Sequence, residues 1–135
     1  MNDAVEVRHG SLSVMYTRDG EFGRFVFEGS ITDDALVACL VAVWQHPDYH
    51  FEGPELYDFR NADATGLTAA GVRALAESNA EHFTGRPDHR SAVVVDAPLM
   101  FGFGRMFSAF AGDRGDNVAV FEGVADASYW LRSRE

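Results

Sequence analysis

Short strand patterns alternate with helical patterns from residue 55 onward, and this alternation constrains the fold more than any other feature. The strand patterns cover residues 55–59, 91–95 and 117–121, and helical patterns follow that begin near Thr68, Pro98 and Ala125. Residues 91–95 are apolar without alternation, which is typical of a strand covered on both faces. Strands joined by crossover helices pair in parallel through right-handed connections. We therefore expect a parallel sheet with helices packed on it.

The first part of the chain adds an antiparallel pair and one more helix. Residues 11–17 and 24–28 alternate apolar with polar side chains, and Asp19-Gly20 between them favours a tight hairpin turn. Thr32 can cap a helix over residues 33–46, which Pro47 ends. The sequence thus predicts one α/β domain over residues 1–135: a β-hairpin followed by three βα units, forming a mixed sheet flanked by helices.

The helix over residues 33–46 carries more apolar surface than one buried stripe needs. A second, adjoining stripe consists of Val37, Val41 and Trp44. A helix this apolar is either deeply buried or pressed against a partner. We expect this stripe to be a partner surface, and a homodimer is the first form of partner that we expect.

Charge and cysteine content exclude several classes of function. The chain has a formal net charge of −10, and all of its 11 basic residues other than histidine are Arg. An acidic protein repels a phosphate backbone, so we expect no nucleic acid partner. Mechanisms that need a lysine are excluded. Cys39 is the only cysteine and lies in an apolar helical pattern, so we expect it to pack in the core.

Neither a signal-peptide pattern nor a run of about 18 apolar residues is present, so we expect no membrane insertion and a cytoplasmic location.

Polar side chains near strand ends are the candidates for chemistry. Asp58, Arg60, Asp63 and Asp96 lie at or just after two strand patterns, where open α/β sheets build their sites. Clustered carboxylates could hold Mg²⁺, or they could cap helices and bind loop amides. We favour capping, and we expect no catalytic residue, metal or cofactor; an enzyme would have to use these four residues.

Three stretches resemble a known family. They are Tyr57-Asp58-Phe59-Arg60 leading to Thr65-Gly66-Leu67, residues 97–106, and the closing pattern of residues 118–131. With the hairpin-then-βα order, they resemble the STAS domain, the SpoIIAA-like fold of anti-sigma-factor antagonists. The resemblance extends to a subgroup of small bacterial STAS/SEC14-like proteins whose function is largely unassigned.

The resemblance also implies a place for regulation. Antagonists carry a phosphorylatable Ser or Thr in an Asp-Ser-Ser-Gly-Leu turn, and this chain reads Asp63-Ala64-Thr65-Gly66-Leu67. Thr65 would then be the phosphoacceptor, with Asp63 beside it. Thr68 is the better helix cap, so Thr65 is expected in a loop three residues earlier, and an unmodified turn threonine is the alternative.

Two hypotheses of function follow. The first is a non-enzymatic regulatory or protein-interaction domain resembling anti-sigma-factor antagonists, with an unknown protein partner. The alternative is a carrier or sensor of an apolar, lipid-like small molecule. It is motivated by the Phe- and Met-rich helix after Pro98, on which Phe101 points away from the main stripe and Phe103 lies within it.

Overall fold

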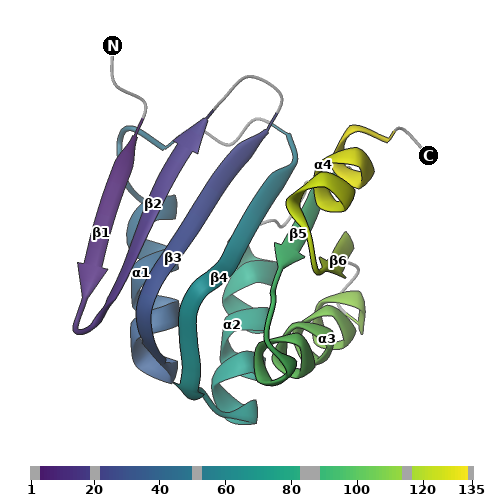
Figure 1. Ribbon diagram of the computed structural model, residues 1–135. Coiled ribbons are helices and arrows are strands. Elements are labelled where there is room, and N and C mark those ends of the chain that lie inside the picture. Colours follow the sequence, from purple (N-terminus) through teal and green to yellow (C-terminus); the bar gives the residue numbers. More distant parts are fainter. Residues whose placement is uncertain (1–3, 19–21, 50–52, 83–88, 114–116, 134–135) are drawn as a thin grey trace.

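The computed structural model describes residues 4–18, 22–49, 53–82, 89–113 and 117–133. Six strands and four helices lie in these ranges (Figure 1). In chain order they are β1 (Val5–His9), β2 (Leu12–Arg18), β3 (Gly23–Thr32), α1 (Asp33–Trp44), β4 (Glu55–Gly66), α2 (Ala69–His82), β5 (Arg90–Val94), α3 (Pro98–Asp113), β6 (Asn117–Phe121) and α4 (Val124–Arg132).

The strands form one mixed sheet in which spatial order equals chain order, β1 to β6. The predicted hairpin is present as β2 and β3, which pair antiparallel with Val14 opposite Phe27. Its Asp19-Gly20 turn lies outside the described residues. Strands β3 to β6 pair in parallel through crossover helices, which confirms the predicted mixed α/β sheet.

Strand β1 lies at the edge of the sheet and was not predicted from the sequence. It pairs antiparallel with β2, with Val5 opposite Tyr16, and Gly10 turns the chain at a φ of 61°. Val5 is the only buried residue among its five, so the strand has too few buried apolar positions for a strand pattern to be recognised in the sequence. The hairpin is therefore part of a three-stranded antiparallel unit.

Strand β4 is longer than predicted and runs to Gly66 instead of ending at Phe59. Its second half is mostly exposed, so it lacks the apolar pattern of a strand. The backbone of this second half is nevertheless paired, because β3 is ten residues long and extends beside it. Ser30 of β3 pairs with Asp63 and Thr32 with Gly66, and the β3–β4 pairing contains two register shifts. The prediction of a loop here was wrong.

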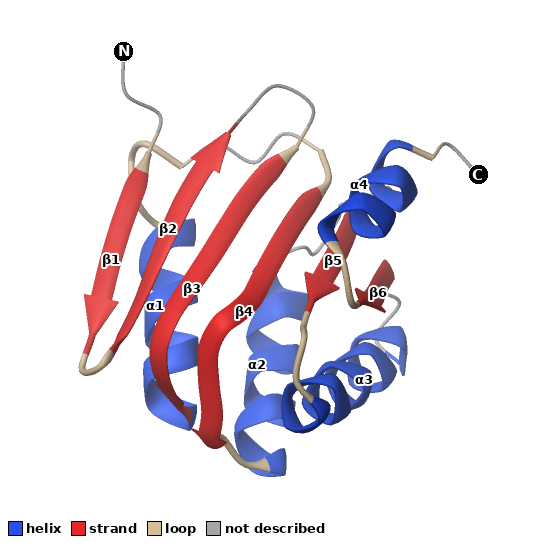
Figure 2. Cartoon of the chain, in the orientation of Figure 1, coloured by secondary structure: helices blue, strands red, loops and turns tan. Residues whose placement is uncertain are grey.

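Helices α1, α2 and α3 cover one face of the sheet, and α4 covers part of the other (Figure 2). Strand β5 therefore has helices on both faces, as its unalternated pattern predicts. Val93 belongs to the larger buried cluster beneath α1 to α3. Ala92 and Val94 belong to the smaller cluster beneath α4.

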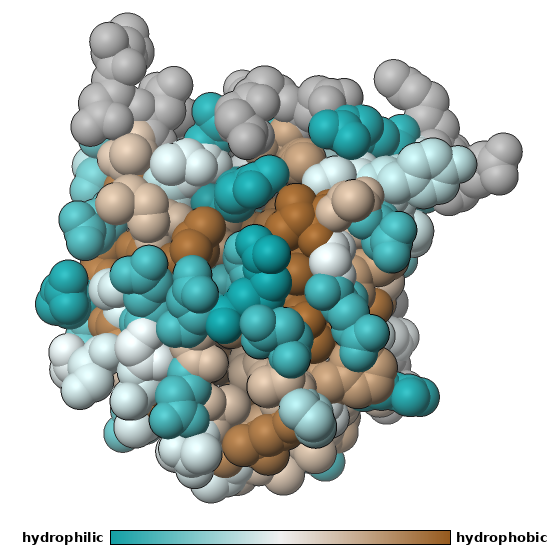
Figure 3. All heavy atoms as spheres, viewed as in Figure 1, coloured by the Kyte–Doolittle hydropathy of each residue, from teal (hydrophilic) through white to brown (hydrophobic). Residues whose placement is uncertain are grey.

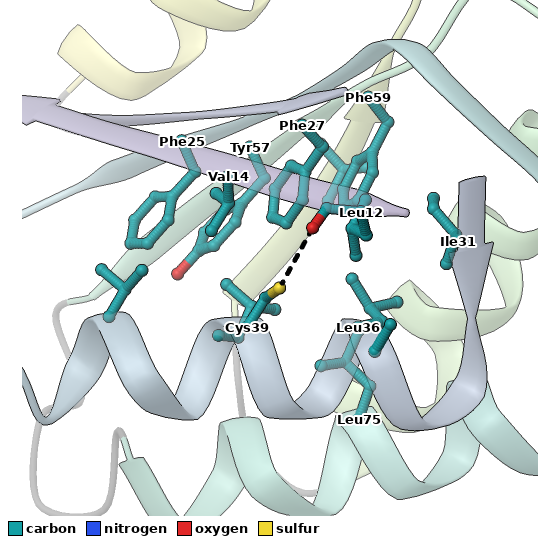
Figure 4. Close-up of a cluster of buried hydrophobic side chains, with 14 of the residues drawn as sticks. Leu12, Val14, Phe25, Phe27, Ile31, Leu36, Cys39, Tyr57, Phe59 and Leu75 are labelled. Carbon is teal, nitrogen blue, oxygen red and sulfur yellow. Dashed lines mark hydrogen bonds between the residues drawn. The ribbon is translucent and has the colours of Figure 1, made fainter. Parts of the chain in front are cut away.

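The larger cluster places aromatic rings of β3 and β4 against α1 (Figure 4). Phe25 stacks on Tyr57 with ring centroids 4.4 Å apart. Phe27 stacks on Phe59 in the same way, at 4.2 Å. Cys39 of α1 lies beneath the rings, and its Sγ is 3.9 Å from the carbonyl oxygen of Leu12. Burial raises the pKa of this thiol, which confirms the predicted role in packing.

Candidate functional site

Asp58 and Arg60 form an ion pair on the face of the sheet that α1 to α3 do not cover. The Arg60 Nε and Nη2 atoms donate to the two carboxylate oxygens of Asp58 at 2.9 and 2.8 Å, and the backbone N–H of Arg60 donates to Oδ1 at 3.0 Å. The Asp58 side chain is 6% exposed and that of Arg60 is 41% exposed. Burial opposes ionisation of Asp58, but the hydrogen bonds and charge of Arg60 outweigh it, so the pKa of Asp58 is lowered.

Asp96 belongs to the same neighbourhood, and Asp63 does not. Asp96 lies just beyond β5, and its charge contributes to the raised pKa of Arg60, after the hydrogen bond and charge of Asp58. Asp63 lies in β4 five residues beyond Asp58, opposite Ser30 of β3. The structure thus brings together Asp58, Arg60 and Asp96 from the predicted set, while the placement of Asp63 in a loop was wrong.

Figure 3 shows this face, with hydrophilic side chains gathered across its middle between apolar patches. Among the six described strands the spatial order never reverses, so these strands form no switch point of the kind at which open α/β sheets build a ligand crevice. The Asp58 carboxylate is engaged by Arg60 and is almost fully buried. Across the described ranges, no group of three or more His, Cys, Asp or Glu side chains is arranged to hold a metal ion.

Thr65 is an exposed residue near the end of β4, and its backbone N–H donates to Oδ1 of Asp63 at 2.9 Å. Helix α2 starts at Ala69, after Thr65 in the chain. There the Thr68 hydroxyl accepts from the N–H of Gly71 at 3.2 Å, so Thr68 caps the helix as predicted. Thr65 is therefore three residues before the cap, as expected, but in strand instead of loop.

A carboxylate from the neighbouring helix is already bound at this helix start. Asp33 of α1 accepts from the N–H of Thr68 at 2.8 Å and from its hydroxyl at 2.6 Å. Gly71 makes room for it, because a Cβ on Gly71 would lie 2.0 Å from Oδ1 of Asp33. The first residues of α1 and α2 are thus joined through Asp33.

A buried polar cluster that was not predicted from the sequence lies near the other end of these helices. Glu55 is 0% exposed, and its two carboxylate oxygens accept from the hydroxyls of Tyr49 at 2.6 Å and Tyr57 at 2.7 Å. Burial, followed by the negative charge of Glu55, raises the pKa of Tyr57 well above its ordinary value. The Tyr49 oxygen is 3.1 Å from Nε2 of His82, whose ring stacks on Trp44 at 4.2 Å.

No local sequence signal marks this cluster, because its members come from β4, α2 and the loop after α1. In the sequence, Glu55 is only the first residue of a strand pattern, and nothing near it indicates that the hydroxyls of two tyrosines bind its carboxylate.

The second apolar stripe of α1 lines a groove between α1 and α2. Val37 and Val41 are half-buried and form part of its wall. Trp44 lines a smaller hollow that continues from the groove, because Val41 and Gln45 line both. The groove has a volume of about 620 Å³ and the hollow about 240 Å³.

The Phe- and Met-rich helix α3 contributes to an apolar cavity between the sheet and α1 to α3. Phe103 and Met100 line it, but its volume is only about 40 Å³. Pockets for drug-sized ligands measure roughly 300–1,000 Å³. Phe101 lies elsewhere on α3, half-buried, with the Arg105 guanidinium 5.9 Å from its ring centroid. This cavity has no room for a lipid chain.

Comparison with known proteins found no matching family profile and no matching curated protein. Two solved structures are similar over nearly the whole chain. One is an uncharacterised protein of the DUF3478 family with a SpoIIAA-like fold from Shewanella loihica; it has a TM-score of 0.56 and 18% identity and covers 94% of this chain and 98% of its own. The fold is SpoIIAA-like.

A second structure with this similarity is an anti-sigma factor antagonist from Mycobacterium paratuberculosis. Its TM-score is 0.56 at 15% identity, and the match covers 91% of this chain and 96% of that one. The SpoIIAA-like fold expected from the sequence is thereby confirmed. In the described part of the chain, no helix is long and apolar enough to cross a membrane.

Proposed function

We propose that this chain is a non-enzymatic regulatory domain that binds another protein, as the name of the similar antagonist indicates for that protein. The observation that carries the proposal is the groove between α1 and α2, which is open to solvent and walled by Val37 and Val41. An open groove between two helices can receive the apolar face of a partner segment.

The carboxylates that an enzyme would use support the same proposal. Asp58 is held by two donor groups of Arg60, and Asp63 accepts from the N–H of Thr65. These bonds give both carboxylates a role in the structure of β4. A general base would instead need to reach a substrate proton.

Thr65 is the residue at which we propose that the interaction is regulated. A phosphate would add nearly two negative charges. It would enter an acidic surrounding, since Asp63 binds the backbone of Thr65 and Asp33 already holds the start of α2. Phosphorylation would therefore change the charge at the end of the groove that Asp33 lines.

Affinity capture from an extract of the source organism tests the proposal. Val41→Glu alters the groove, and Met15→Glu is the matched control because Met15 is exposed on β2. We expect one protein to be captured by the wild type and by Met15→Glu but not by Val41→Glu, and to bind again as a purified component. Its affinity should change in Thr65→Glu but not in Thr65→Val. Identical capture by Val41→Glu and wild type would show that the proposal is wrong.

A further inference from the structure

The groove between α1 and α2 has the length of a short helix. Helices α1 and α2 have 12 and 14 residues, and they lie side by side beneath the sheet (Figure 1). At 1.5 Å per residue they are about 18–21 Å long, which matches a guest helix of similar length. Together with the adjoining hollow, the groove extends from Asp33 at the start of α1 to His82 at the end of α2.

Small side chains line the middle of the groove. Its lining includes Ala38 and Ala42 of α1 and Ala70, Gly71 and Ala74 of α2. Small residues let another helix approach closely, and Val37 and Val41 then provide apolar contact. The middle of the groove is therefore suited to the apolar face of an amphipathic helix.

Acidic side chains lie at both ends of this apolar stretch. Asp33 and Asp34 line one end of the groove, and Glu81 lines the hollow at the other. Arg is not present among the lining residues. The guanidinium of Arg73, which belongs to α2, lies 4.4 Å from the ring centroid of Phe110 on α3, away from the groove.

We infer that the groove binds an amphipathic helix of a partner protein that carries Arg or Lys at both ends of a small, apolar face. This inference rests on the proposed function and names the chemistry of the partner. A second copy of the chain fits less well, because each copy has a net charge of −10 and its own α1 begins with Asp33 and Asp34 and contains no basic residue. Charge complementarity of this kind sets which partner is chosen and how fast it associates.

A designed peptide tests the inference directly. The probe is an 18-residue amphipathic peptide without Trp, with Ala and Leu on one face and two Arg residues at each end; a second peptide has Glu at every Arg position. Binding is followed by fluorescence of a Trp130→Phe variant, which leaves Trp44 in the hollow as the only tryptophan.

We expect the Arg peptide to bind and the Glu peptide not to bind. Asp34→Lys together with Glu81→Lys should weaken binding of the Arg peptide about tenfold, through loss of two ion pairs. Glu28→Lys together with Glu122→Lys is the matched control, since both residues are exposed outside the groove and the change in net charge is the same. The control should bind as the parent does, and its circular dichroism should match.

Equal binding of the two peptides, or equal weakening by both pairs of substitutions, would overturn the inference. So would a dimer in light scattering that Val41→Glu dissociates, because the occupant would then be a second copy. A captured partner that needs the groove but binds through a segment that is not a basic helix would overturn the inference and leave the proposed function standing. Peptide binding without any groove-dependent partner in the extract would overturn only the proposed function.

Discussion

At the scale of single residues, Asp58 shows how a carboxylate can be nearly buried and still ionised. Its two oxygens bind the planar guanidinium of Arg60 in a fork, which is the geometry that Arg provides and Lys does not. Removing one partner of such a pair leaves the other desolvated and unpaired, and this loss exceeds what the pair itself contributes.

We predict that Arg60→Met lowers the free energy of unfolding by about 1–3 kcal/mol at neutral pH, because the Asp58 carboxylate loses its donors. The pair lowers the pKa of Asp58 in the folded protein, so its contribution is present above the unfolded pKa of about 4 and is lost as the pH falls further. Urea unfolding at several pH values between 7 and 3 measures the difference.

Arg8→Met serves as the control, since its side chain is 67% exposed, and it should change stability by less than about 0.5 kcal/mol. A loss in Arg60→Met that stays constant from pH 7 to pH 3 would contradict the assignment.

At the scale of elements, α1 and α2 are joined at their first turns through Asp33 and Thr68. The contact requires a residue without Cβ at position 71, because α2 brings Gly71 against the Asp33 carboxylate. Gly102 on α3 provides a contrast: a Cβ there would meet nothing within 4 Å.

We predict opposite effects of the same substitution at these two glycines. Gly71→Ala should destabilise the protein by about 1–3 kcal/mol, because it displaces Asp33 from Thr68. Gly102→Ala should stabilise it by about 0.5–1 kcal/mol, through the ordinary helix preference of Ala over Gly. Thermal or urea unfolding of both variants provides the measurement.

In an Asp33→Gly background, which also removes the Cβ of residue 33 that would lie 2.8 Å from the new Cβ, Gly71→Ala should no longer destabilise the protein. If it still does, the Asp33 side chain is not the cause.

The parts of the fold that were predictable from the sequence are those marked by local chemistry. Thr32 caps α1 by accepting from the N–H of Ala35, and Pro98 is the first residue of α3, as each residue type suggests. Strand β5 is apolar on both faces because both faces are covered. The second half of β4 is a strand because it pairs with β3, which is distant in the sequence. The local residue pattern of β4 therefore did not predict where the strand ends.

The same distinction applies to the candidate site. The stripe of Val37, Val41 and Trp44 could be predicted because all three residues belong to one helix, and the structure places the stripe along a groove. The opposite wall comes from α2, more than 25 residues later, and the acidic ends become apparent only when the two helices lie together. The meeting of Glu55 with Tyr49 and Tyr57 likewise requires the folded sheet.

At the scale of the whole molecule, the net charge of −10 opposes compaction. The described ion pairs that offset this repulsion include one between exposed side chains, Arg8 with Glu6, which contributes little. Asp58 with Arg60 is partly buried and is screened less by salt.

We predict that NaCl raises the urea midpoint, because salt screens repulsion among the excess carboxylates more than it weakens the ion pairs. The rise should saturate by about 0.2 M, where the Debye length has fallen below about 8 Å. Urea titrations from 0.01 to 0.5 M NaCl measure the effect. A midpoint that falls with salt would show that attractive pairs dominate, while a rise that stays linear to 0.5 M would indicate a general salt effect on burial.

Cys39 gives this fold an internal reporter of its own opening. It is the only thiol in the chain, it is fully buried beneath the aromatic rings of the sheet, and burial raises its pKa. Because alkylating reagents react with the thiolate, they can modify Cys39 at an appreciable rate only when α1 separates from the sheet. When reclosing is faster than labelling, the labelling rate of the folded protein divided by that of an unfolded chain gives the fraction of molecules in which Cys39 is open to the reagent. The free energy of this opening can therefore be measured on the unmodified chain in buffer without denaturant.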